Sequence, residues 1–460
     1  MHYNIAIIGG GPGGYTAAIY AGKKQAKIAL IEKRELGGTC LNRGCIPTKA
    51  LIHSAKLLQD LKNAHRFGIS AGEIKIDWNI MQKNSSRSVK TLTQGVKNLL
   101  KANGVTVFNG TAKLSEKNTI IISGETKQNT ITADNIIIAT GSISTTIPIL
   151  GHNLQNVITS DQALFLETLP SSMLIIGGGV IGLEIGYIYN TFGVEITIIE
   201  MLQNILPNHD KDISKALRKH LEKQGIKIYT DTRAKQIKQK ENTLQTFFET
   251  QEGIKTVDSE KVLVATGRTP AVDAFIDTGL NIDKTGIVVN DYLQTNIENI
   301  YAIGDVTGKS MLAHVASHQG IVAVKNILGE KTKMDYKVIP SCIYTNPEVA
   351  SVGMSELEAR VKYKDNIKVG RFPYAASGKA MTMGERYGFV KIIAEPRYNE
   401  ILGVHIIGPH ATEMIAEASL AIKLECTAEE LANTIHAHPT LSEAIMEAAF
   451  DLLGEPIHKM

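Results

Sequence analysis

The sequence predicts an α/β protein in which one parallel-sheet unit occurs twice and a C-terminal α+β section follows. Two glycine patterns of the form G-x-G-x-x-G indicate the repeat, because each lies between a short apolar strand and a helical pattern. A length of 460 residues exceeds one hydrophobic core and suggests roughly three or four domains. No such glycine pattern occurs after Tyr336, so we expect that final section to serve assembly or substrate binding.

The first copy begins at the strand Asn4–Ile8, and the glycines Gly9, Gly11 and Gly14 follow it directly. The first glycine allows a tight turn, the second lets a pyrophosphate approach the backbone, and the third permits close packing of helix on strand. Glu32 ends the next predicted strand and can accept hydrogen bonds from ribose hydroxyls. The strand, helix and acid together predict a dinucleotide-binding site of the Rossmann type.

The second copy repeats each of these parts. The strand Met173–Ile176 precedes Gly177, Gly179 and Gly182, and Glu200 ends the following strand. The interval between the third glycine and the acid is the same in both copies. This repeat predicts two Rossmann-like dinucleotide-binding domains in one chain.

Each copy also closes later with a similar strand and turn. The strand Asn135–Ala139 runs into a turn that contains Gly141 and Ser142. The strand Lys261–Ala265 runs into a turn that contains Gly267. The match extends the internal repeat over most of each unit.

Cys40 and Cys45 stand close together in the stretch Gly37–Lys49, with Gly44 supplying a turn between them. Pro47 falls where the first turn of a helix tolerates proline, so we expect Cys45 near a helix N-terminus, where the dipole lowers the pKa of a thiol. A structural disulfide closing so short a loop would stabilise the fold by only about 2 kcal/mol. Redox chemistry explains the pair better, since thiol–disulfide exchange needs a thiolate beside a resolving thiol. Two dinucleotides beside a cysteine pair suggest electron transfer between the cofactors and the thiols.

Composition excludes several classes of function. Lys and Arg number 49 against 46 Asp and Glu, a net charge of +3, so no basic bias indicates nucleic acid or an anionic membrane. Four cysteines are too few for a disulfide-built secreted protein and favour a reducing compartment. No apolar run approaches the roughly 18 residues that a membrane span requires. We expect a cytoplasmic protein.

The remaining elements connect these units and build the final section. In chain order we expect two helices within 50–103 that break at 68–77, a hairpin at 113–131, a crossing segment at 145–151, a strand at 300–305 that ends in Asp305, and a helix at 312–328. The final section is predicted to contain strands at 389–394 and 401–407 and helices at 412–424, 428–432 and 441–453.

Along its whole length the chain resembles the pyridine nucleotide-disulfide oxidoreductases, and within them the dihydrolipoamide dehydrogenases, the E3 components of 2-oxoacid dehydrogenase complexes. The resemblance rests on both glycine patterns, on Gly37–Lys49, and on the segments Tyr301–Asp305, Met311–His314, Ile343–Ala350 and His436–Glu443. It implies an FAD-binding domain at 1–147, an NAD-binding domain at 148–270, a return to the FAD domain at 271–337, and an α+β dimerisation domain at 338–460.

The resemblance also implies roles for single residues. Cys40 is expected to exchange with the dithiol substrate and Cys45 to lie against the flavin. Lys49 is expected to pair with Glu184 near the flavin, whereas Arg43 has no role that we can assign. The implied FAD-binding residues are Gly9, Gly11, Gly14, Glu32, Lys49, Ala112, Gly141, Ser142, Asp305 and Ala313, and those for NAD are Gly177, Gly179, Gly182, Glu184, Glu200 and Gly267.

His438 and Glu443 match the base of the family and the carboxylate that orients it. A thiol with a pKa of about 8.5 must lose its proton before it attacks, and an imidazole is best suited to accept that proton at neutral pH. We interpret His436 as a surface residue. Cys342 and Cys426 have no thiol or histidine nearby in the sequence and are interpreted as core packing.

Glu200 favours NAD over NADP, because a carboxylate accepts a hydrogen bond from the 2′-hydroxyl and repels a 2′-phosphate. NADPH-dependent members of the family typically place arginines after this strand, where Met201–Gln203 stand here. The expected reaction is oxidation of protein-bound dihydrolipoamide through a Cys40–Cys45 disulfide and FAD, with hydride transfer to NAD+.

The resemblance implies a homodimer as the functional unit. It also implies that the lipoyl domains of 2-oxoacid dehydrogenase complexes or the H protein of glycine cleavage supply the substrate. Two other functions stay open: an NADPH-dependent disulfide or metal reductase on the same fold, and a non-catalytic flavoprotein that serves as an adhesin or regulatory subunit. The cysteine pair and His438 argue against the second, because binding alone needs neither.

Overall fold

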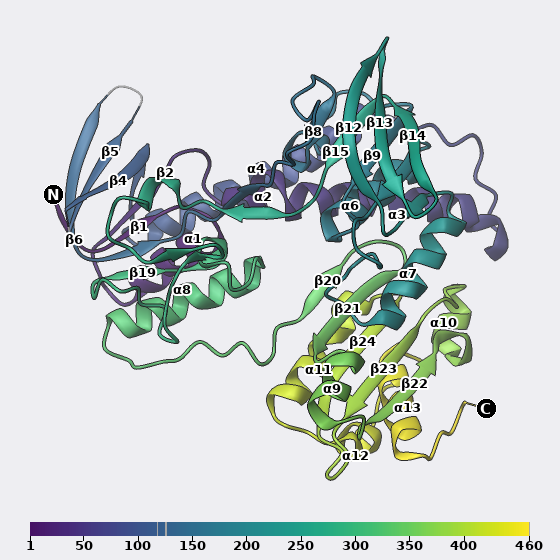
Figure 1. Ribbon diagram of the computed structural model, residues 1–460. Helices are drawn as coiled ribbons and strands as arrows, with labels where there is room; N and C mark the ends of the chain where they lie inside the picture. The colour runs from purple at the N-terminus through teal and green to yellow at the C-terminus, as the bar shows by residue number, and fades with distance from the viewer. Residues whose placement is uncertain (117, 125–126, 460) are drawn as a thin grey trace.

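The computed structural model describes residues 1–116, 118–124 and 127–459, and its elements form three regions (Figure 1). Two regions contain mainly parallel sheets, and the C-terminal region contains an antiparallel sheet flanked by helices. This arrangement confirms the predicted fold class. The division of the chain at residues 147, 270 and 337 stays a prediction.

The first sheet has the order β3-β2-β1-β6-β5-β4, with β19 paired to β6. Its centre is parallel, and β2, β19, most of β1 and the second half of β6 are apolar because both faces of the sheet are covered there. The strands are β1 (His2–Ile8), β2 (Ile28–Glu32), β3 (Thr106–Asn109), β4 (Thr111–Glu116), β5 (Thr119–Ser123), β6 (Gln128–Ile138) and β19 (Ile300–Ala302).

Strand β6 differs from the prediction of a separate hairpin and closing strand. It is one strand of 11 residues whose first half pairs antiparallel with β5 and whose second half pairs parallel with β1. The strand combines an alternating hydrophobic pattern with a continuous one. Ile131 and Ala133 are buried on one face only, whereas Ile136–Ile138 are buried on both. Residues 117, 125 and 126 of the expected hairpin lie outside the described residues.

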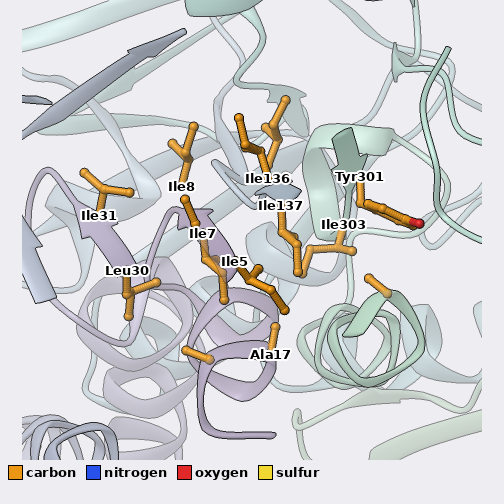
Figure 2. Packing of buried hydrophobic residues seen from close by; sticks show 14 of the residues in the cluster. Ile5, Ile7, Ile8, Ala17, Leu30, Ile31, Ile136, Ile137, Tyr301 and Ile303 are labelled. Atoms are coloured by element: carbon orange, nitrogen blue, oxygen red, sulfur yellow. The ribbon is translucent and has the colours of Figure 1, made fainter. Parts of the chain in front are cut away.

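Helices α1 (Pro12–Lys23) and α8 (Ala313–Ile327) pack against each other beside this sheet (Figure 1). A Cβ on Gly13 or Gly320 would meet the backbone of the other helix, which explains two small residues at the contact. Figure 2 shows side chains of β1, β2 and β6 on both faces of the sheet, with Ala17 of α1 on one face and Tyr301 and Ile303 beside them. This core holds the first glycine-rich turn at the carboxyl ends of the strands.

The second region repeats the parallel sheet, in the order β11-β10-β9-β15-β8. A three-stranded antiparallel sheet, β12-β13-β14, adjoins it. The elements are β8 (Val157–Thr159), α5 (Ser160–Ala163), β9 (Ser172–Ile176), α6 (Val180–Thr191), β10 (Glu195–Ile199), α7 (Lys211–Lys223), β11 (Lys227–Tyr229), β12 (Arg233–Lys240), β13 (Thr243–Thr250), β14 (Gly253–Ser259) and β15 (Lys261–Val264).

The two regions are joined by a pair of short antiparallel strands, β7 and β16. The helices inserted between β2 and β3 extend between the regions, and their break lies where the sequence predicts it. These elements are α2 (Gly38–Arg43), α3 (Cys45–Asn63), η1 (Ala64–Phe67), α4 (Trp78–Ala102), β7 (Ser142–Ser144), β16 (Arg268–Pro270), η2 (Asp273–Phe275), β17 (Ile282–Asp283), β18 (Gly286–Ile287) and η3 (Gly304–Thr307).

The C-terminal region is built on the antiparallel sheet β20-β21-β24-β23-β22, whose central strand β24 is buried along its length. Buried Lys391 of β23 joins it to the second region through Asp210 (2.8 Å) and Asp212 (2.8 Å) at the start of α7. Its elements are β20 (Ser341–Ile343), β21 (Glu348–Gly353), α9 (Glu356–Tyr363), β22 (Lys368–Pro373), η4 (Tyr374–Ala376), α10 (Gly378–Met383), β23 (Phe389–Ala394), β24 (Ile401–Gly408), α11 (Ala411–Lys423), α12 (Ala428–Asn433) and α13 (Glu443–Leu453).

Across the residues that the structure describes, no helix combines the length and the apolar character needed to cross a membrane.

Candidate active site

The two glycine-rich turns have the same backbone geometry. Gly9 and Gly177 open the turns with φ of +110° and +115°, values that side chains rarely allow. A Cβ on Gly14 would collide with the carbonyl oxygen of Gly9, and one on Gly182 with that of Gly177. These glycines are therefore required by the fold of the turn itself.

The middle glycine of each turn, Gly11 or Gly179, is explained by a different requirement. A Cβ on Gly179 would meet no protein atom within 4 Å, and one on Gly11 would only reach Gly38 at 4.0 Å. Because no contact within the chain demands glycine here, the open space above each turn fits a pyrophosphate close to the backbone. The two sites therefore have the shape that dinucleotides require.

Glu32 and Glu200 are held by backbone amides of their own turns. Glu32 Oε2 accepts from Gly10 N (2.7 Å), and Glu200 Oε2 accepts from Gly178 N (2.7 Å). The second oxygen of each accepts from an amide two residues later, at 2.7 and 2.8 Å. A carboxylate offers about four lone-pair sites, so each keeps capacity for ribose hydroxyls.

A cavity of about 1950 Å³ runs along both turns and the redox stretch. Sites for drug-sized ligands measure about 300–1,000 Å³, so this volume suits two dinucleotides. All predicted FAD and NAD residues line it except Gly14 and Gly182, which pack inside their turns. His438 and Glu443 do not line it.

Polar groups of the first site meet at the β7–β16 pair. Ser142 Oγ donates to Asp305 Oδ2 (2.6 Å), and Arg268 Nε donates to Ser142 Oγ (2.7 Å). Arg268 was missed in the sequence, although it stands in the turn beside Gly267. Ala313 begins α8, whose N-terminus faces the cavity and suits an anionic group.

Cys40 lies in α2 and Cys45 is the first residue of α3, as the sequence predicts. Both are free thiols. A hydrogen bond from the Cys40 thiol lowers the pKa of Cys45 to about 7, with Lys49 adding to the effect and burial opposing it. The same hydrogen bond, with burial, raises the pKa of Cys40. Cys45 is thus the more acidic thiol of the pair.

Lys49 of α3 pairs with Glu184 of α6 at 2.9 and 3.1 Å. Tyr344 of the C-terminal region completes the group, because its amide donates to Glu184 (3.0 Å) and its ring lies 4.4 Å below Lys49 Nζ. Sequence reasoning did not assign Tyr344 a role, although its segment carries part of the family resemblance. Three regions of the chain therefore meet beside the cysteine pair.

His438 stands in the loop between α12 and α13, and its side chain is 78% exposed. Its Nδ1 contacts Glu443 Oε1 at 2.8 Å, and Glu443 Oε2 accepts from Thr440 N at 2.8 Å. Nε2 has no partner among the described residues and is free to exchange a proton. Figure 1 places this loop at the far end of the C-terminal region, well away from α2, so one chain alone does not bring His438 to Cys40.

The interpretation of His436 as a surface residue is wrong. Its side chain is only 6% exposed, and its ring nitrogens contact Glu417 Oε1 (2.7 Å) and Thr434 O (2.8 Å). The sequence hides this contact because Glu417 stands on another helix, α11. Cys342 and Cys426 pack against the C-terminal core as predicted, and Cys342 also lines the cavity.

Arg43, which the sequence left without a role, is paired. Its guanidinium contacts the Glu35 carboxylate and lies 4.0 Å from Asp161 of α5. The redox helix α2 is thereby tied both to the loop after Glu32 and to the second region.

A redox-active cysteine pair beside two dinucleotide sites defines a flavin-dependent disulfide oxidoreductase. The chain belongs to the pyridine nucleotide-disulphide oxidoreductase family, whose model matches residues 3–320, while the model of the family's dimerisation domain matches residues 339–449. Members of this family are FAD-dependent, and this chain is a flavoprotein disulfide oxidoreductase.

Similar proteins cover the full chain. The dihydrolipoyl dehydrogenase of Bacillus subtilis (strain 168) is 41% identical over 99% of both chains, and that of Thermus scotoductus is 42% identical over 99% of this chain and 98% of its own. The solved Cu(II) complex of the HOCl-induced flavoprotein disulfide reductase RclA from Escherichia coli matches with a TM-score of 0.88 and 28% identity, covering 98% of this chain and 99% of that one.

Proposed function

We propose that this protein is a dihydrolipoyl dehydrogenase that oxidises protein-bound dihydrolipoamide with NAD+. The observation that carries the proposal is the Cys45 thiol, hydrogen-bonded to the Cys40 thiol in a cavity that both glycine-rich turns share. The full-length similarity to dihydrolipoyl dehydrogenases supports the choice of substrate.

The thiol chemistry follows from the positions and acidities of the two cysteines. In the oxidised enzyme, a dihydrolipoyl thiolate attacks Cys40 Sγ, and the S–S bond to Cys45 breaks. Cys45 departs as a thiolate, which its lowered pKa favours. The second lipoyl thiolate then displaces Cys40, so that the substrate leaves as a disulfide and both cysteines are reduced.

His438 supplies the base of this exchange. Its Nε2 accepts the proton of the first attacking thiol, and Glu443 orients the ring through Nδ1. The proton of the second lipoyl thiol passes to Cys40 as Cys40 departs, because the pKa of Cys40 is raised. Because His438 lies far from Cys40 within one chain, we propose that the base of each site is His438 of the partner subunit in a homodimer. The match to a dimerisation domain supports this assembly.

The first turn, Glu32, Ser142 and Asp305 would hold FAD, and the second turn with Glu200 would hold NAD+. When bound, these groups accept the electron pair of the reduced cysteines and carry it away as a hydride. Lys49, fixed by Glu184, contributes to the lowered pKa of Cys45. Glu200 supports NAD+ rather than NADP+, since its buried carboxylate would repel a 2′-phosphate.

The testing experiment is a steady-state assay of the purified protein with dihydrolipoamide against NAD+ and NADP+. We expect turnover with NAD+ and little with NADP+. Turnover of other disulfides with NADPH, without oxidation of dihydrolipoamide, would contradict the proposal and favour an NADPH-dependent reductase.

We place the enzyme in the cytoplasm, where lipoyl domains or the glycine-cleavage H protein would supply the substrate.

A further inference from the structure

Helix α4 carries a row of positive charges that no acid balances. Its cations are Lys83, Arg87, Lys90, Lys97 and Lys101, all exposed. No Asp or Glu occurs between Trp78 and Ala102, although Asp and Glu nearly equal Lys and Arg in the whole chain. Within the described part of the chain, none of the five forms an ion pair.

The five cations fall on one side of the helix, and we call them the cationic stripe. Lys83, Lys90 and Lys97 repeat at heptad spacing, and Arg87 and Lys101 stand one turn further along the same side. The stripe extends for about 27 Å at the rise of an α-helix. Surface charges of mixed sign are the norm, so a single-signed row of this length indicates an anionic partner.

The side of α4 that faces the protein is hydrogen-bonded to the redox helices. Ser85 Oγ contacts Pro47 O of α3 at 3.5 Å, and Thr93 Oγ1 contacts Asn42 Oδ1 of α2 at 3.4 Å. Figure 1 shows α4 beside α2, the helix that contains Cys40. The stripe therefore lies on the exposed side of a helix that packs directly on the helices of Cys40 and Cys45.

We propose that the cationic stripe is the docking surface for an acidic protein domain that carries the dihydrolipoyl group. The proposal rests on the proposed function, and it extends that function by naming the charge of the partner and the helix that receives it. A protein partner is favoured over nucleic acid or a lipid surface because the helix that carries the stripe also packs on the redox helices. Charge attraction of this kind raises association rates by about 10- to 1,000-fold.

The test compares two substrates on the intact, FAD-loaded dimer. One is free dihydrolipoamide, and the other is a recombinant reduced lipoyl domain whose sequence has an excess of Asp and Glu. The stripe variant is Lys90→Glu/Lys97→Glu, and the matched control is Lys215→Glu/Lys219→Glu on α7, where two exposed lysines undergo the same charge change. We expect kcat/KM for the domain to fall about tenfold in the stripe variant alone. Free dihydrolipoamide should turn over equally in all three proteins.

The salt dependence gives a second readout. In the wild type, kcat/KM for the domain should fall as NaCl rises, and the stripe variant should lose most of this slope. An unchanged rate with the domain, or equal losses in the stripe and control variants, would overturn the proposal. Loss of the dimer in the stripe variant would also overturn the proposal. The same holds if the stripe variant loses binding to duplex DNA or phosphatidylserine vesicles while its kcat/KM for the domain is unchanged. Absence of wild-type turnover with free dihydrolipoamide would instead contradict the proposed function.

Discussion

Cys45 owes its acidity mainly to one hydrogen bond from its neighbour Cys40. Cys40→Ala removes that donor, so the pKa of Cys45 should rise from about 7 toward its ordinary value of 9.0. Because folding lowers the pKa of Cys45, the Cys45 thiolate stabilises the folded protein at pH values above the pKa of the unfolded state. This contribution to the free energy of unfolding is lost as the pH falls through the pKa of the folded state. Cys40→Ser keeps a hydroxyl donor and should retain most of the shift.

The measurement is a titration of thiolate absorbance in the reduced protein, with Cys45→Ser as the blank. Both Cys40 variants should keep bound FAD and lose dihydrolipoamide turnover. Full turnover in either variant would remove Cys40 from the exchange.

Glu200 should decide between the two nicotinamide cofactors. Glu200→Arg removes an acceptor for the 2′-hydroxyl and supplies a partner for a 2′-phosphate. Hydrogen bonds to charged groups are worth about 1.5–3 kcal/mol, so the ratio of kcat/KM for NAD+ over NADP+ should fall at least tenfold. Glu200→Gln, which keeps an acceptor, should change the ratio less. A wild type that already prefers NADP+ would show that Glu200 does not set the choice.

His436 should act as a positioning residue for His438. The loop between α12 and α13 is largely exposed, and the contact of His436 with Glu417 ties it to α11. His436→Ala should therefore lower kcat for dihydrolipoamide about tenfold, since losing one such contact costs about 1.5 kcal/mol. NADH oxidation by ferricyanide, which needs no base from this loop, should stay unchanged.

A double variant separates this role from general damage. If His436 and Glu417 act as a pair, His436→Ala/Glu417→Ala should be no slower than either single variant. Equal losses in both assays, or additive losses in the double variant, would show that the contact does not position the base.

The sequence predicted those functional residues that belong to a local motif. Gly9, Glu32 and Cys45 are recognisable because turn, strand and helix start lie next to one another in the chain. Arg268 and Tyr344 were missed because their partners stand on segments far away in the sequence, and no local pattern records such contacts.

At the scale of elements, the glycines of each turn should separate folding from binding. Gly182→Ala puts a Cβ against the carbonyl of Gly177, and overpacking of this kind costs about 1–3 kcal/mol. Gly179→Ala meets no protein atom and should leave the unfolding temperature unchanged while weakening NAD+ binding. Calorimetry and titration of NAD+ would measure the two effects. Equal loss of stability in both variants would contradict the assignment.

Strand β6 shows where patterns fail at this scale. Its alternating half and its continuous apolar half each have a clear period, and the sequence therefore suggested two strands. The hydrophobic pattern cannot show that the two halves form one strand. The pattern changes along β6 because one half of the strand is covered on one face and the other half on both, which is a property of the tertiary structure.

At the scale of the whole molecule, the sequence predicted both dinucleotide units but placed His438 at the site only through the family resemblance. The structure separates His438 from Cys40 within one chain, and this separation makes a shared site testable. Each site of the homodimer would combine Cys40 of one chain with the partner's His438. Cys40→Ser and His438→Ala chains should each be nearly inactive alone.

Co-expression of the two variants should restore activity. Random pairing makes about half of the dimers mixed, and each mixed dimer has one intact site and one site with both changes, so about a quarter of wild-type activity should return. A site built within one chain predicts no recovery, because neither chain then carries both groups. Separate tags on the two chains would verify that mixed dimers form. Mixed dimers with no more turnover than their parents would therefore rule out the shared site.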